Sequence, residues 1–110
     1  MFAHADSNGF REALPGVHMK TLVHGAKTLL TEFRLKAGHV LPRHSHPHEQ
    51  TGYLVSGVLE LTIGDQTFTT RAGDSWCIPG GVEHGAVVTE DTVAIEVFSP
   101  VREEYLPRER

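Results

Sequence analysis

The eight histidines of this 110-residue chain are unevenly spread, and four fall within ten residues, at His39, His44, His46 and His48. Residues two apart on a β-strand point to the same face, so His44 and His46 can direct two imidazoles toward one metal ion. A solvated histidine-rich loop accounts for an isolated His-x-His motif equally well. This segment alone therefore predicts either a metal site or a polar loop.

Two groups of residues at fixed spacing set these histidines in a wider pattern. Each group combines glycine with histidine, and one follows the other along the chain. The groups are Gly38-x5-His44-x-His46-x3-Gln50-x6-Gly57 and Gly73-x5-Pro79-Gly80-Gly81-x2-His84. Together they resemble the paired signature motifs of the cupin superfamily, and the resemblance covers nearly the whole chain.

The resemblance implies both a fold and a metal site. The fold is an all-β, single-domain cupin, which is a jelly-roll barrel or double-stranded β-helix of two facing sheets. The first motif of that family supplies two His and a Glu or Gln, and the second supplies one His, so the implied ligands are His44, His46, Gln50 and His84. Three imidazoles and an amide oxygen suit a divalent transition metal, without choosing among Ni, Zn, Fe, Mn and Co.

Gln50 is one of two departures from the common cupin pattern, in which Glu is usual at this position. Val88 is the other, standing where the second motif often ends in Asn. A neutral amide leaves the metal its full positive charge and so strengthens it as a Lewis acid. Glu49 is an alternative carboxylate, but neighbours on a strand face opposite sides, so Glu49 and Gln50 cannot both point inward. The resemblance favours Gln50.

The other histidines have no partner at ligand spacing. We expect His4, His18 and His24 to be surface residues. His39 and His48 flank the predicted site, where they either tune it or lie exposed at its rim.

Glu96 is a carboxylate within the apolar segment Thr92–Phe98. Because side chains alternate along a strand, it shares a face with Ala94 and Phe98. That face is either the barrel interior or a solvent-exposed edge, and an unpartnered buried carboxylate is costly. In the interior, Glu96 becomes a candidate general acid or base near the metal.

A narrower resemblance rests on short segments spread along the chain. The segments are His44–Gln50, Gly73–Ser75, Pro79–Ala86 and Val97–Pro100, the last followed by Arg102-Glu103. They are similar to the small pectin-degradation cupins, which help convert 4,5-unsaturated uronate monomers into linear keto-uronates. The resemblance implies a pocket lined by Glu96, where Asp is usual, and by Phe98 and Arg102. We expect Glu96 and Arg102 to be catalytic, and Phe98 and Tyr53 to contact a small anionic sugar acid.

These residue types suit the ring-opening reaction. An unsaturated uronate is a cyclic hemiacetal, and its opening removes the proton of the anomeric hydroxyl, releases the ring oxygen as an enol and protonates C4. The metal can stabilise the developing enolate, Glu96 can carry the proton, and Arg102 can pair with the substrate carboxylate.

Two other functions use the same barrel. A metal-dependent dioxygenase requires a similar ligand set, although the chain offers only Phe98, Trp76 and Tyr53 as aromatic candidates for its substrate. A non-enzymatic binding or sensing barrel is the second alternative. We expect Trp76 to serve packing and Cys77 to be a small core residue.

Short strands between turn residues must position all of these groups. Glycines at positions 38, 52, 57, 64, 73, 80, 81 and 85, together with Glu90-Asp91, act as breaks. The segments between them alternate or are rich in β-branched residues, which is typical of a β-sandwich or barrel. A single helical turn is possible at 7–14, and residues 1–12 and 103–110 are expected to be charged tails. The predicted strands are 17–23, 28–35, 58–63, 66–71, 75–78, 85–89 and 92–98.

Composition limits the classes of protein. The length predicts one domain, 1–110, with the barrel at about 17–100. A net charge of −4 with scattered Lys and Arg predicts no nucleic-acid partner. The absence of an apolar run beyond three residues, of a signal pattern and of a second cysteine predicts a cytoplasmic chain without membrane contact. The resemblance and the small core also predict a homodimer.

Overall fold

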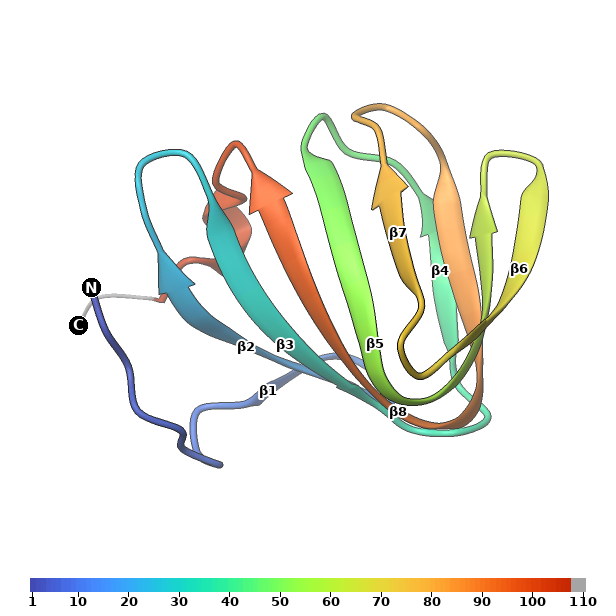
Figure 1. Ribbon diagram of the computed structural model, residues 1–110, viewed down its shortest axis with the longest axis horizontal. Coiled ribbons are helices and arrows are strands. Elements are labelled where there is room, and N and C mark those ends of the chain that lie inside the picture. Colours follow the sequence, from blue (N-terminus) through green and yellow to red (C-terminus); the bar gives the residue numbers. More distant parts are fainter. Residues whose placement is uncertain (108–110) are drawn as a thin grey trace.

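The computed structural model describes residues 1–107 and contains eight β-strands and one short 3-10 turn over that range (Figure 1). The predicted all-β barrel is confirmed. The elements are β1 Arg11–Leu14, β2 Val17–His24, β3 Leu29–Leu35, β4 Val40–His44, β5 Glu49–Ile63, β6 Gln66–Arg71, β7 Ser75–Ile78, β8 His84–Ser99 and η1 Glu103–Tyr105.

Strands β5 and β8 are the long elements around which two facing sheets are built. They pair antiparallel from Glu49 opposite Ser99 to Ile63 opposite His84. The first part of β5 pairs with β7 and the last part of β8 with β3, which β2 and β1 extend. The other halves pair with β6 and β4. Figure 1 shows both strands curving from one sheet into the other, so the same two strands carry residues of both walls.

Gly57 marks the corner where β5 changes sheet. The β5–β8 register shifts on either side of Ser56, as expected for bulges that bend a strand. Gly57 has a φ of +97°, and a Cβ there would lie 2.3 Å from the carbonyl oxygen of Asp91. Only glycine therefore allows β5 to cross β8 this closely.

The core lies between the sheets and follows the alternation of each strand. Leu29, Leu54, Ala94 and Phe98 are among its most buried side chains. Cys77, which we predicted in the core, is exposed because Ile78 is the residue of β7 that points inward. That prediction was wrong by one step of the strand alternation.

Several predicted boundaries are also corrected. Residues 11–14 form β1 instead of a helical turn or a charged tail, because they pair with β2. The predicted breaks at Gly52, Gly57, Gly85 and Glu90-Asp91 lie inside β5 and β8.

The predicted C-terminal tail is also corrected in part. Tyr105 and Leu106 pack against the core, and residues 108–110 lie outside the described part. Within the described residues, no helix has the length and apolar character needed to cross a membrane.

Candidate metal centre and cavity

Three histidines from two strands and a loop lie close together, with His84 buried and His44 exposed. His44 ends β4, His84 begins β8, and the two are direct cross-strand partners. His46 follows in the loop after β4, so the expected alternation along one strand does not place it. One ring nitrogen from each of the three lies within 4.8 Å of the others. The chain thus contains a cluster that can hold a metal ion.

Hydrogen bonds fix which nitrogen of each ring faces the centre of the cluster. Each Nδ1 lies next to a backbone carbonyl oxygen, which can only accept, so each Nδ1 carries the proton and donates it. Each Nε2 is then left with a lone pair, the form that binds metals. The three bonds are His44 to Pro42 O at 2.8 Å, His46 to His48 O at 3.0 Å and His84 to Val82 O at 2.9 Å.

Gln50 completes the set of donor atoms. Its Oε1 lies 3.0 Å from Nε2 of His46, while its amide nitrogen donates to Oε2 of Glu96. With the His46 proton on Nδ1, His46 Nε2 and Gln50 Oε1 are both acceptors and cannot bond to each other. A cation bound by both atoms removes the repulsion between them. His84 Nε2 is buried and has no partner among the described residues. The Nε2 atoms of the three histidines and Oε1 of Gln50 fit a divalent transition metal.

Burial keeps two of the three imidazoles, those of His46 and His84, in their ligand form. Desolvation lowers the pKa of His46 and of His84, and the nearby Arg102 guanidinium acts in the same direction on both. Both rings therefore remain neutral at neutral pH. Glu49, the alternative ligand, is exposed, whereas Gln50 is buried.

Glu96 faces the interior together with the buried Ala94 and Phe98. In the sheet it lies opposite Gly52 of β5, which has no side chain, and diagonal to Gln50. The diagonal spacing is within reach of long side chains and explains the Gln50–Glu96 hydrogen bond. Burial raises the pKa of Glu96 to about 8, although the Arg102 charge acts to lower it.

Arg102 enters the same site from the segment after β8. Its guanidinium carbon lies 5.2 Å from the centre of the Phe98 ring and 4.2 Å from that of Tyr105. Its Nε donates to Glu104 at 2.8 Å. Stacking and this ion pair hold a positive charge next to Glu96.

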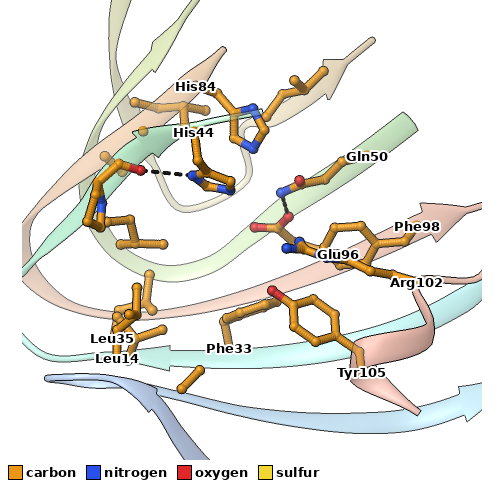
Figure 2. Close-up of a pocket in the computed structure, with 18 of the residues that line it drawn as sticks. Leu14, Phe33, Leu35, His44, Gln50, His84, Glu96, Phe98, Arg102 and Tyr105 are labelled. Atoms are coloured by element: carbon orange, nitrogen blue, oxygen red, sulfur yellow. Dashed lines mark hydrogen bonds between the residues drawn. The ribbon is translucent and has the colours of Figure 1, made fainter. Parts of the chain in front are cut away.

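One cavity of about 620 Å³ is lined by all of these groups except His46 (Figure 2). Figure 2 shows His44, His84 and Gln50 on one side and Glu96, Arg102 and Tyr105 on another, with Leu14, Phe33 and Leu35 below. The volume is within the range of small-molecule sites. The lining residues that the sequence identified are His44, Gln50, His84, Glu96, Phe98 and Arg102.

Tyr53, which we predicted to contact substrate, lies outside this cavity. Its side chain is 50% exposed, because on β5 the buried Gln50 and Leu54 alternate with outward residues. The two predicted rim residues, His48 and His39, lie in different places. The His48 ring is 5.6 Å from that of His46, whereas His39 packs over Gly16. His4, His18 and His24 are not part of the cluster.

Tyr105, Arg11 and Trp76 are among the lining residues that the sequence did not identify as site residues. Tyr105 and Arg11 lie in segments predicted to be charged tails, and Trp76 was assigned to packing. An aromatic residue within a charged C-terminal segment was the available signal for Tyr105, since a solvated tail has no use for a large apolar ring.

Comparison with known proteins agrees with this geometry. Residues 31–99 match the family described as Cupin domain. KdgF from Halomonas sp. is 30% identical, with a TM-score of 0.90, over 96% of this chain and 100% of that one. An RmlC-like cupin from Shewanella frigidimarina is 26% identical, also with a TM-score of 0.90, over 96% and 95% of the two chains.

A further RmlC-like cupin, from Desulfovibrio desulfuricans, supports the fold alone. It is 23% identical over 91% of this chain and 97% of its own, with a TM-score of 0.73. The search of curated proteins gave no match.

Proposed function

The chain belongs to the cupin domain family, and on that premise we propose that it is a metal-dependent enzyme that opens cyclic 4,5-unsaturated uronates to linear keto-uronates. The observation that carries the proposal is the position of Glu96. A carboxyl group whose pKa is raised by burial shares one cavity with His44, His84 and an arginine. The similarity of the motifs to pectin-degradation cupins and the full-length match to KdgF support it.

The proposed roles follow from the side chains. His44, His46, His84 and Gln50 hold a divalent transition metal, which supplies Lewis-acid stabilisation of the developing enolate. Arg102 pairs with the substrate carboxylate, a geometry that guanidinium groups favour. Phe98 forms the apolar floor beside it.

In its ionised form, Glu96 takes the proton from the anomeric hydroxyl and returns it to C4. A pKa near the working pH suits a group that must both accept and release a proton. Its chain is one methylene longer than that of the Asp usual in the similar cupins, and it reaches Gln50, whose amide nitrogen donates to its Oε2.

The test is the loss of the conjugated alkene. Unsaturated galacturonate is incubated with metal-loaded protein under anaerobic conditions, and its ultraviolet absorbance is followed against buffer alone. We expect faster decay with protein, and a rate equal to that of buffer contradicts the proposal. Turnover that requires oxygen points instead to a dioxygenase. Saturable binding without turnover points to a sensing barrel.

We further propose that the protein acts as a homodimer on a small anionic sugar acid, without a nucleic-acid or membrane partner, and that it is cytoplasmic. The surface that favours the dimer is the outer face of the sheet that contains β3 and the second half of β8, where apolar side chains of neighbouring strands lie in register.

A further inference from the structure

The hydroxyl of Tyr105 is a polar group in the cavity to which the proposed reaction gives no role. Figure 2 shows it pointing into the cavity on the side where Glu96 and Arg102 lie. Among the described residues, Tyr105 makes hydrogen bonds only through its backbone: its N–H donates to Arg102 O at 2.9 Å, and its carbonyl accepts from Thr21 Oγ1. Tyr105 is one of the residues that line the cavity.

The ring that carries this hydroxyl is held from several sides. Its centre lies 5.3 Å from that of Phe98 and 6.1 Å from that of Phe33, both in edge contacts. Arg102 stacks on it at 4.2 Å. A phenylalanine would make these same contacts, so packing does not account for the hydroxyl. A rigid ring with a free donor directed at a reaction site is a preorganised hydrogen-bond donor.

The protonation of Tyr105 agrees with a donor role. Burial raises its pKa above 10, and the nearby Glu96 charge adds to this effect, while Arg102 opposes it. The hydroxyl therefore keeps its proton at neutral pH. It is suited to donating a hydrogen bond and not to acting as the base.

Building on the proposed function, we propose that Tyr105 Oη donates a hydrogen bond to the ring oxygen of the unsaturated sugar acid as the ring opens. The ring oxygen is the atom on which negative charge develops when its bond to C1 breaks. The proposal thus makes Tyr105 a catalytic residue that recognises a cyclic substrate with an enol-ether oxygen.

The step balances without proton transfer from Tyr105. The O1–H bond breaks and its proton passes to Glu96, while the freed electron pair forms the C1=O bond. The C1–O5 bond breaks and its pair goes to O5, which accepts the Tyr105 hydrogen bond. The C5=O5 bond then forms as the C4=C5 pair takes the proton from Glu96 at C4. The result is an isomer of the substrate, and Tyr105 is unchanged.

The experiment compares Tyr105→Phe with Tyr53→Phe, since these are the two tyrosines of the chain and Tyr53 lies outside the cavity. Steady-state decay of unsaturated galacturonate is measured with metal content and melting temperature. We expect Tyr105→Phe to lower kcat on the order of 10²-fold, as does removal of a single oxyanion donor. KM, metal content and melting temperature should stay near wild type, because the charge develops only in the transition state. Tyr53→Phe should match wild type in every measurement.

The outcomes separate this inference from the proposed function. An active wild type with an equally active Tyr105→Phe overturns the role of the hydroxyl alone. An unchanged kcat with a raised KM shows that Tyr105 only binds substrate, which also overturns it. A wild type that does not accelerate the decay overturns the proposed function, and the inference falls with it. If Tyr105→Phe is destabilised, it is compared with Tyr105→Leu, which removes the ring as well as the hydroxyl. Equal loss of kcat in both variants assigns the loss to the hydroxyl. Loss of kcat only in Tyr105→Leu assigns it to packing and overturns the inference.

Discussion

Gln50 is the residue that connects the histidine cluster to Glu96. An amide has one acceptor end and one donor end, and here the acceptor faces His46 while the donor faces Glu96. A glutamate at this position would lose the donor and place two carboxyl groups together. The amide therefore allows a carboxyl group to lie directly behind the ligand set, which accounts for the departure from the usual Glu.

Substitution of a cluster histidine should remove the metal. We expect His84→Ala to weaken metal binding by more than the 10- to 100-fold typical of losing an outer partner of a ligand, because it removes a buried ligand itself. The measurement is metal content by elemental analysis after dialysis against metal at fixed free concentration. His4→Ala, at an exposed histidine outside the cluster, is the control and should retain wild-type content. Equal metal content in the two variants would contradict the assignment.

Glu96 should make the stability of the metal-free protein depend on pH. Its pKa is about 8 in the folded state against an ordinary 4.5, so the folded chain holds a proton that the unfolded chain has lost between these values. Glu96 therefore makes its full contribution to the free energy of unfolding below about pH 4.5. This contribution declines as pH rises through about 8, by at most about 1.4 kcal/mol for each pH unit. With chelator present, the melting temperature of wild type should fall more between about pH 5 and about pH 9 than that of Glu96→Gln. Parallel curves would falsify this prediction.

At the scale of elements, sequence patterns predicted most strands, but they divided the two longest strands, β5 and β8, at their glycines. Gly52, Gly57 and Gly85 read as turns because glycine most often interrupts strands. In the structure they are places of close approach within β5 and β8, where a side chain has no room. The sequence pattern cannot distinguish these cases, because the atoms that fill the space come from segments distant in the chain.

Gly52 offers a test of such close approach. A Cβ there would lie 2.2 Å from the Trp76 indole, whereas a Cβ at Gly25 would meet nothing within 4 Å. We expect Gly52→Ala to lower the free energy of unfolding by about 1–3 kcal/mol through overpacking, and Gly25→Ala to leave it nearly unchanged. Chemical denaturation measures both. Trp76 is the single tryptophan, so its fluorescence in the native state should shift only in Gly52→Ala. Equal stability of the two variants would count against tight packing on Gly52.

At the scale of the whole molecule, motif spacing in the sequence identified the histidine cluster and Glu96 but not all of the residues that line the cavity. The cluster and Glu96 lie on β4, the loop after it, β5 and β8, which recognisable motifs mark. Tyr105 and Arg11 come from the two ends of the described chain, and Arg11 donates to the backbone of Glu104 at 3.0 Å. Contacts between distant ends leave no periodic signal, so only the fold brings these residues to the cavity.

The outer face of the sheet that contains β3 and the second half of β8 carries several half-exposed apolar side chains. Leu30, Val97 and Thr51 lie in one cross-strand row, and Glu32, Ile95 and Tyr53 form the next. Their neighbours along each strand point into the core, so these side chains point outward. Exposed apolar side chains on neighbouring strands are typical of an interface, and a two-fold dimer would bury the same face on both copies.

We therefore expect a charge on this face to dissociate the proposed homodimer. Ile95→Glu places a carboxylate between Glu32 and the half-exposed Tyr53, where dimerisation would bury two like charges together on each copy. Light scattering coupled to gel filtration should give twice the 12.1 kDa chain mass for wild type and the single mass for the variant. Val87→Glu is the matched control, since Val87 is 48% exposed on the outer face of the other sheet, and it should remain dimeric. Both variants should keep the wild-type metal content. A monomeric wild type, or a dimer broken by Val87→Glu alone, would show that this face is not the interface.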